Sequence, residues 1–371
     1  MGSHQITLIP ISEVARISKN FLPASISNGY SLKSLFRNIA DDADVRNSVV
    51  AFRDFLHVFF DRLISDGHSY AIPPKIPNSM TDYPFLYNIT NLLVDMGYCG
   101  KLADDGKSLF ISEMPLCTAT IDENGKKKSP KIPISSQMDC LRFLSLCGFE
   151  FNGVDLDGKS LSFSTEHLIE MKYPKNPETL LGLKVLSIAD MELRTDRRYW
   201  NDHNLLRCDY RLLQEYEPDM RDVLLDFLHP LPKKIQAFAL KLHNRYVEKG
   251  LTCINTRLGI ISFAYVHIGK SKKALAERST YQKRIWEFSY SPKDGYCIFV
   301  RPKKADKYAD VIKGFPNTLQ DRITKGYGCY KKQGLPRCNN ECQGIKLPLD
   351  ETILPMAADI QRWIDCEVPS K

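Results

Sequence analysis

The chain has 371 residues, of which 43% are hydrophobic and 26% are charged. These values are ordinary for a soluble globular protein, and the length suffices for two or three domains with a substantial core. No segment approaches the roughly 20 apolar residues that a membrane helix needs, which argues against a membrane protein. The first 20 residues lack a basic start followed by an apolar run, so we expect no secretory signal.

The charge is distributed unevenly along the chain. Residues 1–230 carry 25 Lys and Arg against 31 Asp and Glu, whereas residues 231–371 carry 26 against 13, so the net charges are −6 and +13. This asymmetry predicts that the C-terminal part binds an anionic partner, with nucleic acid as the leading candidate. A lysine-rich surface that contacts only solvent is the alternative.

The cysteines indicate the redox compartment. The chain has eleven, an odd number, and most stand singly among apolar residues. Cys140, Cys147, Cys253 and Cys297 are typical of buried, reduced thiols. Because structural disulfides are rare in reducing compartments, this usage predicts a cytoplasmic location.

The N-terminal segment, residues 1–80, is expected to be mostly helical. Residues 47–64 hold too many apolar side chains for one narrow stripe, so this helix is predicted to pack on more than one side. Residues 71–83 are rich in proline and predict an extended connector.

An internal repeat follows within residues 81–228. A helical apolar pattern, a glycine and the string Asp-Gly-Lys-Ser-Leu occur in residues 85–112 and again in residues 137–164. The glycines, Gly97 and Gly148, are offset by 51 residues and the strings by 52, and Gly97 suits the left-handed position that ends a helix. Asp-Gly between alternating apolar residues predicts a tight β-hairpin, so each copy should be a helix followed by a hairpin. This is the outline of winged-helix modules.

The pattern changes at residues 229–232, where two prolines mark the start of a third region, residues 229–371. The chain is therefore predicted to be α+β: a helical N-terminal part with two helix-plus-hairpin repeats, then a small α+β domain with a four-stranded antiparallel meander. The third region is expected to contain helices over 233–249 and 303–313 and strands over 251–256, 258–267, 283–290 and 296–301.

Basic residues alternate with aromatic residues in two stretches of the third region. Such mixtures suit phosphate contacts combined with stacking on bases, and they also suit an ordinary solvated rim. The aromatic residues are Tyr281, Trp286 and Tyr308. The predicted nucleic-acid-binding residues are Lys270, Lys272, Lys273, Arg278, Lys283, Arg284, Lys303 and Lys304.

A cysteine cluster near the C-terminus predicts a structural zinc ion, the one cofactor that the sequence suggests. Cys338 and Cys342 are separated by three residues, a spacing common in zinc sites, and Cys329 precedes them in a glycine-rich segment. Cys366 is the candidate fourth ligand, although a histidine could also serve. Free thiols and a disulfide or redox pair are the alternatives.

Common catalytic motifs are absent or stand in the wrong context. Residues 153–160 match the string of a phosphate-binding loop, but the residues that follow alternate like a strand, and Asp155 and Asp157 would repel phosphate. There is no Gly-x-Ser-x-Gly nucleophile elbow and no zinc-protease histidine pattern. We therefore expect a regulatory or nucleic-acid-binding protein without catalysis of its own. The alternatives are an enzyme or small-ligand sensor with a site between the two halves, and a scaffold in which those halves pair.

Three stretches, Gly148–Leu156, Tyr173–Ala189 and Cys208–Arg211, resemble a family of cytosolic Firmicutes proteins, mostly clostridial, for which no activity is established. The cysteine tail is similar to a separately occurring Firmicutes module with a cysteine cluster after a small α+β domain. That module has a further cysteine soon after the glycine that follows the third one, whereas here Gly344 leads directly to Ile345. The resemblance implies a host lineage and a domain boundary, and it implies no particular reaction.

Overall fold

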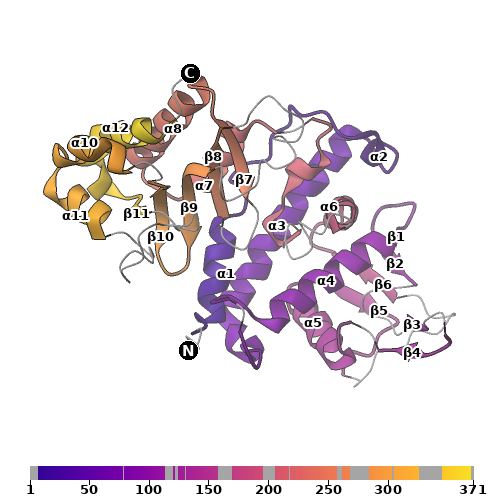
Figure 1. Ribbon diagram of the computed structural model, residues 1–371. Coiled ribbons are helices and arrows are strands. Elements are labelled where there is room, and N and C mark those ends of the chain that lie inside the picture. Colours follow the sequence, from indigo (N-terminus) through magenta and orange to yellow (C-terminus); the bar gives the residue numbers. More distant parts are fainter. Residues whose placement is uncertain are drawn as a thin grey trace. The chain divides into compact units, whose positions relative to one another are not determined.

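The structure is a computed structural model that describes residues 7–77, 79–112, 120–121, 124–129, 131–157, 169–194, 205–216, 218–256, 261–267, 284–302, 305–325 and 345–368. These residues form an α+β protein with a four-stranded sheet, a five-stranded sheet and a two-stranded hairpin, all antiparallel (Figure 1). The chain divides into two compact units, Met1–Pro218 and Asp219–Lys371. Each unit is described by itself below.

The boundary between the units lies before α7 (Met220–Leu228), whereas the sequence pattern suggests residue 229. Phe227 explains the difference, because its ring packs against two aromatic side chains of the second sheet. The ring centroids of Phe263 and Tyr296 each lie 5.0 Å from that of Phe227. The apolar face of α7 therefore belongs to the core of the second unit.

The first unit is built around α3 (Asp42–Asp66), which is packed on more than one side, as its apolar residues predict. It contacts both α1 (Ile11–Asn20) and α6 (Glu178–Arg194). The described residues of the predicted N-terminal segment, 1–80, therefore share one core with the segments that follow them. The remaining helical elements of this unit are α2 (Ser34–Arg37), η1 (Gly67–Tyr70), α4 (Pro84–Cys99), α5 (Ile134–Leu146), η3 (Leu205–Arg207) and η4 (Tyr210–Leu213).

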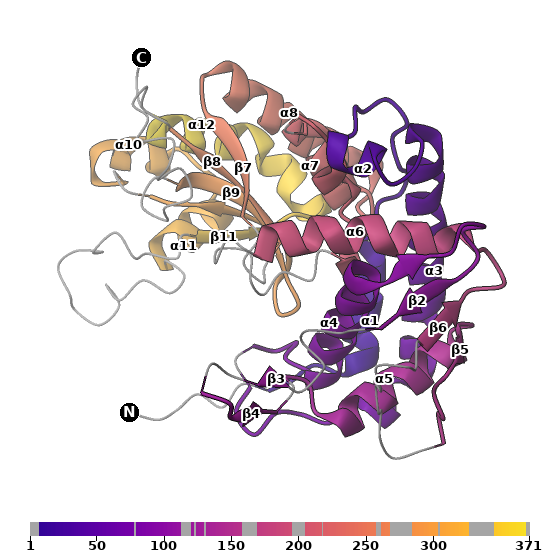
Figure 2. The ribbon, with the colours of Figure 1, turned by 90° about the vertical axis from the view of Figure 1, so that its right-hand side faces the viewer.

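Two glycines allow α6 to approach α3 and α4 closely (Figure 2). A Cβ on Gly182 would lie 2.1 Å from the backbone oxygen of Ser48, and a Cβ on Gly97 would lie 2.2 Å from Ser187 Oγ. We expected Gly97 to end its helix, but α4 continues to Cys99. Its role is helix packing, whereas Gly148, which follows α5, does have a positive φ of 104°.

The four-stranded sheet combines both copies of the repeat. Each copy contributes a helix followed by a pair of antiparallel strands: α4 with β1 and β2, and α5 with β5 and β6. The order is β1-β2-β6-β5, so the second strand of each copy lies in the centre. The strands are β1 (Lys101–Leu102), β2 (Leu109–Ile111), β5 (Glu150–Asn152) and β6 (Ile169–Lys172), and the separate hairpin is β3 (Thr120–Ile121) with β4 (Lys127–Lys128).

The predicted Asp-Gly hairpin can be compared with the structure in the first copy of the repeat. In the first copy, the Asp-Gly pair lies at the hairpin tip, where Gly106 has a φ of 68°. In the second copy, β5 pairs with β6, residues 169–172. Residues 158–168 lie outside the described residues. The predicted equivalence of the two Asp-Gly-Lys-Ser-Leu strings and the winged-helix assignment therefore both stay predictions.

The second unit contains the predicted antiparallel meander and adds a fifth strand from the tail. The order is β11-β10-β9-β8-β7, and β11 (Ile345–Pro348) pairs with β10 (Gly295–Val300). The other elements are α8 (Lys233–Glu248), β7 (Thr252–Thr256), β8 (Ile261–Val266), β9 (Arg284–Ser291), η6 (Ala305–Tyr308), α10 (Ala309–Lys313), α11 (Asn317–Lys325), η8 (Glu351–Met356) and α12 (Ala357–Glu367).

The two faces of the second sheet differ in chemistry. On one face, Trp286 stacks on Tyr265 with ring centroids 3.8 Å apart. The ring centroid of Tyr246 of α8 lies 5.3 Å from that of Trp286. Since side chains alternate along a strand, the neighbours of Trp286 point to the opposite face. Beside the aromatic Phe299, that face carries small and polar side chains that are buried: Ser262, Ala264, Glu287, Ser289 and Cys297.

Candidate functional site

The outer face of α8 presents two lysines of the second unit. One side of this amphipathic helix is buried through Ile235, Leu242 and Tyr246, and the remaining surface of the helix faces solvent. Lys234 and Lys241, seven residues apart and so on one side of the helix, are exposed there. Among the residues that the structure describes, neither ammonium group has a hydrogen-bond or ion-pair partner. Both are therefore available to an anion.

Several carboxylates of the second unit are already neutralised within it. Asp365 of α12 accepts hydrogen bonds of 2.6 Å from both Arg245 of α8 and Lys249, the residue that follows α8. Burial alone would raise the pKa of Asp365, but the hydrogen bonds from Arg245, Lys249 and Tyr246, together with the charge of Lys249, lower it. Asp294 pairs in the same way with Lys346 of β11. These carboxylates therefore repel an approaching anion less than free ones would.

Arg284, a predicted nucleic-acid-binding residue, lies inside the second unit. Arg284 is 8% exposed, and its Nη1 donates a hydrogen bond of 3.1 Å to Glu287 Oε2. Arg301, 3% exposed, donates from Nη2 to Glu287 Oε1 over 2.6 Å. The Arg284 guanidinium thus belongs to a buried ion cluster on the polar face of the sheet, and its role in nucleic-acid binding stays a prediction.

The other predicted nucleic-acid-binding residues lie outside the described residues. The structure therefore places none of these side chains. They are Lys270, Lys272, Lys273, Arg278, Lys283, Lys303 and Lys304.

One of the four predicted zinc ligands, Cys366, lies within the described residues. It is on α12 and is partly buried, and burial raises the pKa of its thiol. Cys329, Cys338 and Cys342 lie outside the described residues. Within the described part of the chain, no group of three or more His, Cys, Asp or Glu side chains is arranged to hold a metal ion.

A hollow of about 710 Å³ with charged and apolar lining residues lies on the outer face of the first sheet. The tip of the β1–β2 hairpin forms one side and the residues after β6 form the other. Glu170 of β6 is one of its lining residues and pairs with Phe110 of β2 and Asn152 of β5 in the sheet. The residues that line it are Ala103, Asp104, Asp105, Lys107, Ser108, Phe110, Glu170, Lys172, Pro174 and Pro177.

Three neighbouring side chains hold the Glu170 carboxylate. Oε1 accepts a hydrogen bond of 2.7 Å from the buried Ser108 hydroxyl and lies 2.8 Å from Lys172 Nζ. Oε2 accepts a hydrogen bond of 2.7 Å from Asn152 Nδ2. The ammonium of Lys172, then the Asn152 amide and the Ser108 hydroxyl, lower the pKa of Glu170 to about 2. The carboxylate is therefore ionised and fixed in place at neutral pH.

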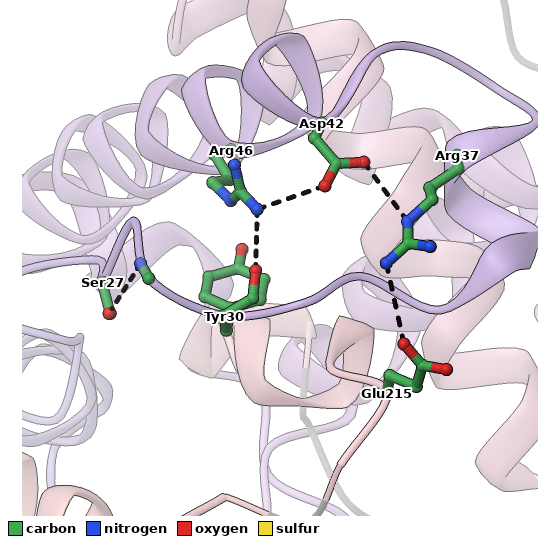
Figure 3. A network of polar contacts seen from close by, with 7 residues as sticks. Ser27, Tyr30, Arg37, Asp42, Arg46 and Glu215 are labelled. Carbon is green, nitrogen blue, oxygen red and sulfur yellow. Dashed lines mark hydrogen bonds and ion pairs between the residues drawn. The ribbon is translucent and has the colours of Figure 1, made fainter.

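A second polar network in the first unit shows how its arginines are used (Figure 3). Asp42, in the first turn of α3, lies 3.5 Å from Arg37 Nε and 3.3 Å from Arg46 Nη2. Arg37 also lies 3.6 Å from Glu215, and Arg46 donates to the Tyr30 carbonyl over 2.7 Å. These guanidinium groups join separate segments of the first unit, so their role is structural.

Comparison with known proteins identified no matching family model, no similar curated protein and no similar solved structure. The resemblance to the Firmicutes family therefore stays a prediction. None of the described helices combines the length and the apolar character that crossing a bilayer would require.

The sequence pattern did not reveal the hollow around Glu170. Its residues come from two separate segments, 103–110 and 170–177, and no motif links them. The Asp-Gly hairpin was the available signal, because it places Lys107 and Ser108 beside a sheet. The strand that carries Glu170 could not be aligned with that hairpin from the repeated string.

Proposed function

We propose that this chain is a nucleic-acid-binding or regulatory protein without catalysis of its own, and that the second unit binds the nucleic acid. The observation that carries the proposal is the net charge. Residues 219–371 contain 27 Lys and Arg against 16 Asp and Glu, whereas residues 1–218 contain 24 against 28. A compact unit with a net charge of +11 attracts phosphate backbones, and a unit of −4 does not.

The second unit also has exposed lysines that are available for phosphate contacts. In the second unit, exposed lysines such as Lys234, Lys241 and Lys307 have no carboxylate partner among the described residues. Ammonium groups of this kind can neutralise phosphates and release the condensed counterions.

The proposal extends to the tail and to the location of the protein. Cys329, Cys338, Cys342 and Cys366 would hold a structural zinc ion, whose binding free energy would also stabilise the tail. Scattered reduced thiols elsewhere in the chain support a cytoplasmic location.

Titration of the full chain against labelled nucleic acid tests the proposal. Fluorescence anisotropy with a generic duplex and a generic single strand, at increasing salt, should show affinity that falls linearly on logarithmic axes. The double variant Lys234→Gln/Lys241→Gln should weaken binding to all sequences alike and reduce the salt slope by about 1 for each phosphate that is no longer neutralised.

Lys313→Gln is the matched control. Lys313 is also an exposed lysine of the second unit, but Asp310 already lies 2.8 Å from its ammonium group. Its removal should change the salt slope less than the removal of either unpaired lysine. The absence of binding to both nucleic acids at low salt would reject the proposal.

A further inference from the structure

The hollow on the first sheet has three features that point to a ligand. The first is a carboxylate with a fixed position. Glu170 lies on a central strand and is held by Ser108, Asn152 and Lys172 at 2.7–2.8 Å. A carboxylate offers about four lone-pair sites, so one acceptor site on Oε2 remains for a donor from outside. Asp104 and Asp105, at the exposed hairpin tip, add two further negative charges to the lining.

The second feature is a pair of ammonium groups in the same hollow. Lys172 contributes one of its three donors to Glu170, which leaves two. Lys107 is exposed and has no carboxylate partner within the described residues. Asp105, beside it, accepts a 2.9 Å hydrogen bond from the Lys107 backbone N–H and so stabilises the hairpin turn. The hollow therefore contains fixed charges of both signs.

The third feature is apolar surface between these charges. Phe110 lies directly opposite Glu170 in the sheet, and its ring is only partly buried. Pro174 and Pro177 also line the hollow. Ligand sites typically combine such apolar surface with a few fixed polar groups, and the volume of about 710 Å³ lies within their usual range of 300–1,000 Å³.

We propose that this hollow binds a zwitterion with an apolar side chain, namely an α-amino acid or a short peptide. The ligand ammonium would donate to Glu170 Oε2, and the ligand carboxylate would accept from Lys172 and Lys107. The side chain would pack on Phe110 and the two prolines. Neither a simple anion nor a simple cation suits the hollow, because each would meet fixed charges of its own sign.

Calorimetric titration of the full chain tests the charge requirement without any mutation. Phenylalanine and the dipeptide phenylalanyl-glycine are the probes, and the tighter of the two identifies the ligand class. N-acetylphenylalanine lacks the ammonium, phenylalanine amide lacks the carboxylate, and each should bind at least tenfold more weakly. Equal binding of the charged and blocked compounds, or no binding of any of them at millimolar concentration, would overturn the proposal.

Two variants test the assigned residues. Glu170→Gln keeps the side-chain shape but removes the charge, and Phe110→Ala removes the ring; each should weaken binding of the preferred probe at least tenfold. Asp139→Asn, an exposed carboxylate of α5 beside Arg142, is the control and should leave binding unchanged. Thermal unfolding confirms that each variant is folded. A folded Glu170→Gln protein with unchanged affinity would contradict the proposal, and if a variant is unfolded, the blocked compounds decide.

Discussion

Phe110 and Glu170 face each other in the central strand pair of the first sheet, and the register is symmetric about them. Leu109 pairs with Met171 on one side and Ile111 with Ile169 on the other. The two copies of the helix-plus-strands unit therefore meet at a local two-fold axis. An aromatic ring occupies this position in one copy and a carboxylate occupies it in the other. The outer face of the sheet is thus chemically asymmetric although its backbone is nearly symmetric.

The close approach of α6 to α3 predicts a strong effect of Gly182→Ala. The added Cβ would lie 2.1 Å from the Ser48 carbonyl oxygen, which is backbone and cannot rotate away. We expect a loss of about 1–3 kcal/mol in the free energy of unfolding, measured by urea denaturation. Gly29→Ala is the control, because the nearest atom to its Cβ would be Ser27 Oγ at 3.8 Å. Equal stability of both variants would show that α6 packs differently.

The buried ion cluster of the second unit predicts a second stability effect. Glu287→Gln would leave the guanidinium groups of Arg284 and Arg301 without their shared carboxylate. Breaking a buried ion pair typically costs about 3–5 kcal/mol, and we expect a loss in this range from chemical denaturation. Asp310→Asn removes the carboxylate of an exposed pair with Lys313 and should change stability by less than about 1 kcal/mol. Similar effects of the two substitutions would mean that the Glu287 cluster is solvated.

The pKa of Glu170 predicts a specific response to acid. Because this pKa is about 2 in the folded protein and 4.5 ordinarily, the unfolded chain binds the proton more readily. The contribution of this carboxylate to stability should therefore be complete above pH 4.5 and be lost as the pH falls towards 2. Carbon-13 NMR of the carboxyl group gives the midpoint directly. Lys172→Gln should raise it, since Lys172 is the largest cause of the shift, and a midpoint near 4.5 in the unaltered protein would contradict this account.

The cysteine tail predicts one zinc ion per chain. Elemental analysis of protein purified without added chelator should give close to one equivalent, and Cys338→Ser should reduce it. Removal of the metal should make the tail more sensitive to proteolysis, because the binding free energy of such a site is also folding free energy. Zinc well below one equivalent would leave reduced thiols as the explanation. Cys140→Ser, at a buried position of α5, is the control for a general effect of losing a thiol.

Local patterns predicted many elements of the fold correctly. The meander of the second unit follows from alternating apolar residues and turn signals such as Asp294-Gly295, where Gly295 has a φ of 67°. Gly250 ends α8 with a φ of 89°, in agreement with its position after the helical pattern. The fifth strand, β11, was not predicted, because its four residues acquire strand structure by pairing with β10 rather than from a long pattern of their own.

The sequence by itself determined the α+β class, the helix and strand periodicities, and the separation of charge between the two parts of the chain, since these depend on residues close together or on simple sums. Only the tertiary structure decided that β6 pairs with β5, that position 97 has no room for a side chain, and which charged groups remain available to a ligand. Arg284 illustrates the reason. Beside Tyr281 and Trp286 it is typical of a basic surface, but the register of β8, β9 and β10 encloses it with Glu287 and Arg301. Burial and pairing depend on residues that are distant in the chain, so no local pattern can specify them.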